Sequence, residues 1–152
     1  GGLIGLSLDQ RILGTGKVVR EKMSHDETFK GITPLQPVLG ADPDEEPSIR
    51  DAELHLRQFC NNLFHIINVG RRIQGFGDDA WKHVVIGSDF DGLIDAVDFC
   101  PTAEHYSLIR VQLLQNLPAL ADEARIPLPA PLHEMVEGIM YQNGYAFLEK
   151  WY

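Results

Sequence analysis

The sequence predicts an α/β fold with a parallel sheet, because its expected strands are apolar and alternate with helices along the chain. Gly2–Leu8 is a short, nearly continuous apolar run, and Val84–Ile86 is a β-branched run. Runs of this kind are typical of strands that are covered on both faces. A helical pattern follows each run, the first after a long loop. Strands that alternate with helices indicate right-handed βαβ units.

Three helices are expected from apolar spacing and end signals. The first runs from the N-cap Ser48 and ends before Gly70 or Gly75, the second runs from Pro101 to about Asn116, and the third runs from Leu132 to Trp151. Pro118 is expected to restart or kink the second helix. Residues 14–47 are rich in Gly, Pro and acidic side chains, which predicts a long functional or mobile loop. Two strands do not form a stable parallel sheet alone, so we expect residues 1–152 to be one part of a larger domain.

Composition excludes several classes of function. The net charge is −9 and Lys and Arg form no stripe, which argues against a nucleic-acid partner. No apolar run approaches the roughly 18–20 residues of a membrane span. Cys60 and Cys100 are isolated, so no disulfide framework is expected. The sequence does not indicate a cellular compartment.

The most informative segment is Lys82–Gly92 (KHVVIGSDFDG), because two carboxylates follow a predicted buried strand. In parallel α/β folds the active site lies at the carboxyl ends of the strands. Asp89 or Asp91 could therefore lie beside a metal-bound water, which is a nucleophile near neutral pH. From spacing alone the simpler interpretation is favoured, in which Asp89 caps a turn and Asp91-Gly92 is an ordinary turn.

The segment GSDFDG after an apolar strand and a long helix resembles the final strand of the membrane dipeptidase (renal dipeptidase) family of metal-dependent amidohydrolases. Three further segments resemble that family in the same order. They are Gly2–Asp9 (its penultimate strand), Ser48–Gly70 (the helix between the last two strands) and Ile139–Leu148 (its closing helix). The resemblance implies the C-terminal portion, about the last two β/α units, of a (β/α)₈ TIM-like barrel.

Carried over by position, the resemblance makes Asp89 the catalytic carboxylate at the metal centre, which handles the proton of the attacking water and then that of the leaving amine. Asp91 and Gly92 match the loop that borders the substrate, and Asn143 matches an Asn expected to be structural. Asp9 and Gln10 stand where the family tends to carry a substrate-facing aromatic residue, which leaves dipeptide specificity open. The family's His-x-Asp, bridging Glu and two later histidines precede the penultimate strand and have no counterpart here.

The sequence therefore predicts a zinc-dependent hydrolase, binuclear in the complete barrel, that cleaves a dipeptide-like amide bond. This chain alone would hold an incomplete site, and the remaining half of the barrel is its first expected partner. A homodimer is also left open. Two alternatives remain: an amidohydrolase that acts on another amide, ester or lactone, and a non-catalytic binding module derived from a barrel.

Overall fold

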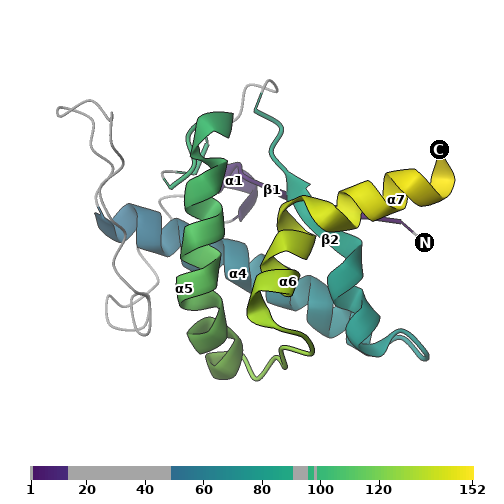
Figure 1. Ribbon diagram of the computed structural model, residues 1–152. Helices are drawn as coiled ribbons and strands as arrows, with labels where there is room; N and C mark the ends of the chain where they lie inside the picture. The colour runs from purple at the N-terminus through teal and green to yellow at the C-terminus, as the bar shows by residue number, and fades with distance from the viewer. Residues whose placement is uncertain (1, 14–48, 91–95, 98) are drawn as a thin grey trace.

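The computed structural model describes residues 2–13, 49–90, 96–97 and 99–152 (Figure 1). Its elements are β1 (Ile4–Ser7), α1 (Gln10–Leu13), α4 (Ile49–Arg71), a 3₁₀ helix (Gly77–His83), β2 (Val84–Gly87), a 3₁₀ turn (Ala103–His105), α5 (Tyr106–Glu123), α6 (Leu132–Glu137), a π-helical turn (Gly138–Gln142) and α7 (Asn143–Trp151). The predicted loop 14–47 lies outside the described residues. Among the helices that are described, none is long and apolar enough to cross a membrane.

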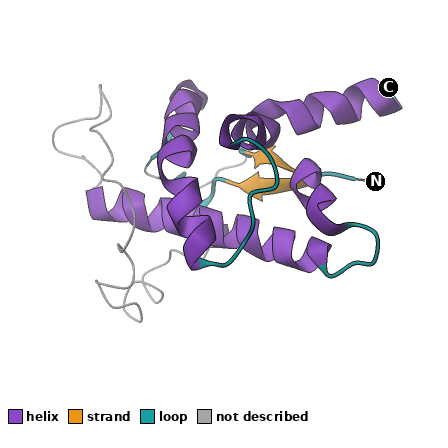
Figure 2. Ribbon diagram, turned by 60° about the horizontal axis from the view of Figure 1, so that its bottom comes forward, coloured by secondary structure: helices purple, strands orange, loops and turns teal. Residues whose placement is uncertain are grey.

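The sheet consists of β1 and β2, which pair in parallel as the alternation of strands and helices predicted. The register places Ile4 beside Val84 and Ser7 beside Gly87. The strands lie between α4 and the C-terminal helices (Figure 2). Because side chains alternate across a strand, Leu6 and Val84 share one face, and both are buried in the core. Gly5, Ser7, Val85 and Gly87 share the other face, which is only partly covered.

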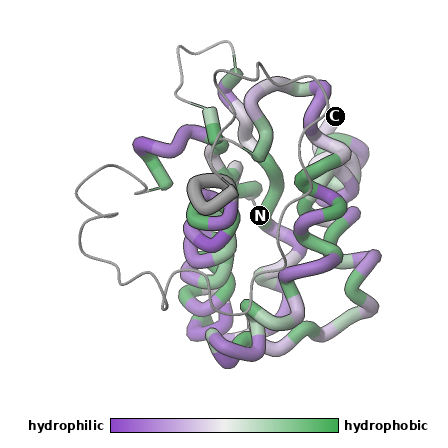
Figure 3. Tube along the Cα trace, turned by 90° about the vertical axis from the view of Figure 1, so that its left-hand side faces the viewer, coloured by the Kyte–Doolittle hydropathy of each residue, from purple (hydrophilic) through white to green (hydrophobic). Residues whose placement is uncertain are grey.

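Helix α4 supplies much of the core, in agreement with the helix predicted over 48–70. Its buried apolar side chains recur at helical spacing: Leu56, Phe59, Cys60, Leu63, Phe64 and Ile67. Phe59 packs edge to face against Phe99, with ring centroids 6.4 Å apart. Apolar and polar residues alternate along the helices in Figure 3, as amphipathic packing requires. The core therefore lies mainly on the α4 side of the sheet.

Helix α5 begins and ends later than the sequence predicted. It runs from Tyr106 through Pro118 to Glu123, so a helix start at Pro101 and a helix end near Asn116 were both wrong. Pro118 has no backbone N–H and so cannot donate a helical hydrogen bond. Leu117 and Leu120, on either side of it, are both buried, and their packing stabilises this turn of the helix. The helix ends before Arg125, which adopts a left-handed conformation (φ 56°).

The C-terminal segment is helical from Leu132 to Trp151, as predicted, but a π-helical turn at Gly138–Gln142 divides it. Directly after this turn, the Asn143 side-chain amide donates hydrogen bonds to the carbonyl oxygens of Trp81 and Val84, at 2.9 and 2.8 Å. These bonds fix the closing helix to the beginning of β2. The structural role expected for Asn143 is thereby confirmed.

Candidate functional site at the carboxyl edge of the sheet

The carboxyl ends of β1 and β2 lie side by side. Their last residues, Ser7 and Gly87, are partners in the parallel register, so the segments 8–10 and 88–90 leave the sheet at the same edge. Parallel strands with this register present the side chains that follow them to one common space. Three of the predicted site residues, Asp9, Gln10 and Asp89, thus follow the carboxyl ends of the two paired strands.

Asp89 lies two residues beyond β2, and its side chain is exposed. Its backbone is in the left-handed region, with φ 54°. Asp tolerates this conformation better than most non-glycine residues, and it turns the chain sharply away from the strand. Among the described residues Asp89 forms no ion pair. An exposed carboxylate on a sharp turn is available to exchange a proton with a bound molecule.

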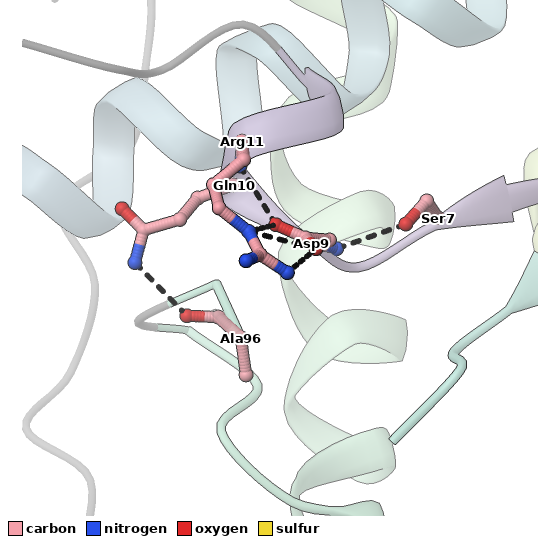
Figure 4. A network of polar contacts seen from close by, with 5 residues as sticks. All are labelled: Ser7, Asp9, Gln10, Arg11 and Ala96. Atoms are coloured by element: carbon pink, nitrogen blue, oxygen red, sulfur yellow. Dashed lines mark hydrogen bonds and ion pairs between the residues drawn. The ribbon is translucent and has the colours of Figure 1, made fainter. Parts of the chain in front are cut away.

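Asp9 is arranged differently, since its side chain is only 3% exposed. Its carboxylate accepts hydrogen bonds from the Arg11 backbone N–H at 2.8 Å and from the Arg11 guanidinium at 2.5 to 3.1 Å (Figure 4). The carbonyl oxygen of Asp9 also accepts the Leu13 N–H at 3.0 Å, so Asp9 caps the short helix α1. A substrate that bound the Asp9 carboxylate would compete with Arg11.

Gln10 connects β1 to the segment that follows β2. Its side-chain amide donates to the Ala96 carbonyl at 3.3 Å, and Asp9 and Ala96 form an isolated antiparallel bridge. The Val97 N–H completes this contact by donating to the Leu8 carbonyl at 2.9 Å. The chain that leaves β2 at Asp89 therefore returns to the end of β1. Asp91 and Gly92, predicted to border the substrate, lie outside the described residues.

Two aromatic side chains border the same region. The rings of Phe90 and Tyr106 lie 5.8 Å apart at an angle of 38°, and both residues are partly buried against the core. This contact ties the residue that follows Asp89 to the first turn of α5. The residue next to Asp89 is therefore packed against the apolar core.

The described residues do not by themselves fit a zinc centre. Within the described ranges, no three His, Cys, Asp or Glu side chains are grouped so that they could hold a metal ion. Burial raises the pKa of the Cys60 thiol to about 12, against a smaller opposing effect of Arg57, and burial raises the pKa of Cys100 to about 12. Both thiols are therefore neutral near pH 7 and unsuited to act as nucleophiles or metal ligands.

No protein-family model, curated protein or solved structure matches this chain. The comparisons therefore identify no family for this chain, and the resemblance of GSDFDG and its neighbouring segments stays a prediction. Arg11, the cation that contacts Asp9 at this edge, was not predicted from the sequence. The signal was present in Ser7-Leu8-Asp9, because an Asp directly before a short helical segment is a common N-cap.

Proposed function

We propose that this chain forms the C-terminal part of a (β/α)₈ barrel in a metal-dependent hydrolase that resembles membrane dipeptidase and cleaves an amide bond. The observation that carries the proposal is the exposed Asp89 at the carboxyl end of a parallel strand, beside the end of β1. Catalytic residues of parallel barrels stand at this end of the strands.

Asp89 would act as a general base and then as a general acid. Its carboxylate would accept a proton from the attacking water and later donate it to the leaving amine. The exposed position of the carboxylate supports this role, since a substrate or water can approach it. The turn at Asp89 would hold the carboxylate in place through its connection to β2 and through the packing of Phe90 on Tyr106.

The zinc that the resemblance implies would need further ligands, because the described residues do not complete a site. The remaining half of the barrel would supply them. Support for such a half comes from the sheet, whose two described strands pair only with each other and leave both outer edges without a neighbouring strand among the described residues. Unpaired strand edges are normally covered or closed into a barrel.

The substrate would be a dipeptide or a similar small amide. Asp9 and Gln10 would border it, with Asp9 acting through Arg11, whose side chain is 60% exposed. A cation at this position favours a substrate that carries a negative charge or a carbonyl group near the cleaved bond. Another amide, an ester or a lactone is compatible with the same arrangement.

The test is Asp89→Asn in the complete barrel, with Asp79→Asn as the matched control. Asp79 is also an exposed carboxylate, but it precedes β2 and is held by Lys82 at 2.7 Å. Removal of a general base is expected to lower kcat by about 10²- to 10⁴-fold, with an unchanged Tm. Asp79→Asn should leave kcat unchanged. Near-normal turnover of the Asp89 variant would refute the assignment.

Metal analysis separates this proposal from the non-catalytic binding module. The hydrolase requires about two bound metal ions per complete barrel, in the manner of binuclear hydrolytic sites. A complete barrel that binds no metal and hydrolyses no amide, ester or lactone would favour the binding module instead.

A further inference from the structure

The aromatic contact between Phe90 and Tyr106 joins the turn after β2 to the beginning of α5. Phe90 directly follows Asp89 in this turn, and Tyr106 is the first residue of the helix. Their ring centroids lie 5.8 Å apart, and both side chains are partly buried against the core. The beginning of α5 therefore packs against the turn that carries Asp89.

The turn at Asp89 depends on such packing because its backbone is in the left-handed region (φ 54°). This conformation is sterically unfavourable for a residue with a Cβ, and it is kept only where the surrounding structure holds it. The Asp89 side chain is exposed and so contributes no packing of its own. The packing of this turn therefore comes from the neighbouring Phe90 ring and its contact with Tyr106.

Tyr106 is itself fixed by the segment that precedes α5. The Thr102 carbonyl oxygen accepts a hydrogen bond from the His105 backbone N–H at 3.0 Å, and the Thr102 hydroxyl lies 2.9 Å from His105 Nδ1. The Cys100 thiol donates to the same carbonyl oxygen at 3.4 Å. These contacts hold the beginning of α5, and with it the Tyr106 ring.

We propose that Tyr106 is a positioning residue for the Asp89 carboxylate. Its ring holds Phe90, and Phe90 holds the turn that places the carboxylate beyond the end of β2. Tyr106 acts only through this turn and does not contact the substrate. The inference rests on the proposed function, because the position of the carboxylate affects turnover only if Asp89 transfers protons.

Tyr106→Ala in the complete barrel tests this role. Without the ring, Phe90 loses its support, and kcat should fall about 10- to 100-fold, since a misplacement of about 1 Å can slow catalysis about 100-fold. KM should stay within about twofold, because Tyr106 does not contact the substrate. Phe90→Ala removes the same contact from the other side and should give a similar fall in kcat, so the test holds even if Tyr106→Ala does not fold.

Two control variants separate this role from a general loss of packing. Tyr106→Phe keeps the ring and should keep kcat within about twofold of the original enzyme. Leu114→Ala removes another side chain of α5 that is partly buried against the core. It should also lower the Tm, but it should leave kcat unchanged at temperatures at which the variants are folded.

The double variant that combines Asp89→Asn with Tyr106→Ala shows whether Tyr106 acts through Asp89. Once the carboxylate is absent, removal of the ring should cause no further loss of kcat, whereas a purely structural effect would lower kcat by the same factor in both backgrounds. Losses that multiply in the double variant, or an unchanged kcat of both Tyr106→Ala and Phe90→Ala, would overturn the positioning role and leave the proposed function standing. Near-normal turnover of Asp89→Asn alone would overturn both.

Discussion

The two ends of β2 differ in what surrounds them. At its beginning, Val84 is fully buried and its carbonyl oxygen receives a hydrogen bond from the closing helix. Beyond its end, Asp89 is exposed on a left-handed turn. The beginning of β2 is therefore fixed by packing and hydrogen bonds, whereas the side chain that follows its end is accessible to solvent.

Under the proposed hydrolase, this difference would correspond to a division between stability at one end of β2 and chemistry at the other. In parallel α/β barrels, the amino ends of the strands contribute mainly to stability, and the carboxyl ends carry the functional side chains. Substitutions at the beginning of β2 should therefore change the free energy of unfolding, and substitutions at Asp89 should change it little. The following predictions compare the two ends, from the largest expected effect on stability to the smallest.

Asn143→Leu should destabilise the chain most. It removes both hydrogen bonds to the carbonyl oxygens of Trp81 and Val84 and leaves these acceptors without their donor, at a cost of about 2 to 4 kcal/mol. Urea unfolding followed by circular dichroism measures the change. Gln142→Leu, at the neighbouring exposed position, is the control and should cost less than about 0.5 kcal/mol. Equal effects of the two variants would show that the Asn143 bonds do not hold the closing helix.

Gly87→Ala should have an intermediate effect, because Gly87 is the last residue of β2. A Cβ at this position would lie 3.1 Å from the Gly5 Cα, and this neighbour is backbone that cannot rotate away. We expect a loss of about 1 to 3 kcal/mol in urea unfolding. Gly2→Ala is the matched control, because a Cβ there meets nothing within 4 Å. If Gly87→Ala were as stable as the control, β1 and β2 would not approach as closely as the register requires.

Much of the secondary structure could be predicted from the sequence, because it depends on local patterns. The strand core Val84–Ile86 lies within β2, and the helix predicted over 48–70 corresponds to α4. The π-helical turn could not be predicted, since it occurs where Asn143 bonds to Trp81 and Val84, about 60 positions earlier in the chain. The passage of α5 through Pro118 likewise depends on tertiary packing.

The position of Asp89 after a strand could be predicted from the sequence, whereas the contacts of Asp9 and Gln10 could not. The pattern of an apolar strand followed by carboxylates located Asp89 beyond a strand, which the structure bears out. The same reasoning treated Asp9 as a residue that faces substrate, and the burial of its carboxylate under Arg11 could not be read from strand periodicity. Its role toward a substrate stays a prediction.

Asp89→Gly should change stability least, although it removes the proposed catalytic group. Glycine adopts a φ of 54° without steric cost, so its stability should lie within about 0.5 kcal/mol of the original chain, whereas Asp89→Ala should lose about 0.5 to 1 kcal/mol. Arg125→Gly, at φ 56°, is the reference for the same backbone conformation far from the carboxyl edge in sequence. Thermal and urea unfolding of the three variants measure these differences. A loss above about 1 kcal/mol for Asp89→Gly would mean that the Asp89 side chain holds the fold, and the contrast between the two ends of β2 would fail. A small change would mean that the fold does not depend on the Asp89 side chain, so that a loss of activity on its substitution could be assigned to chemistry and not to unfolding.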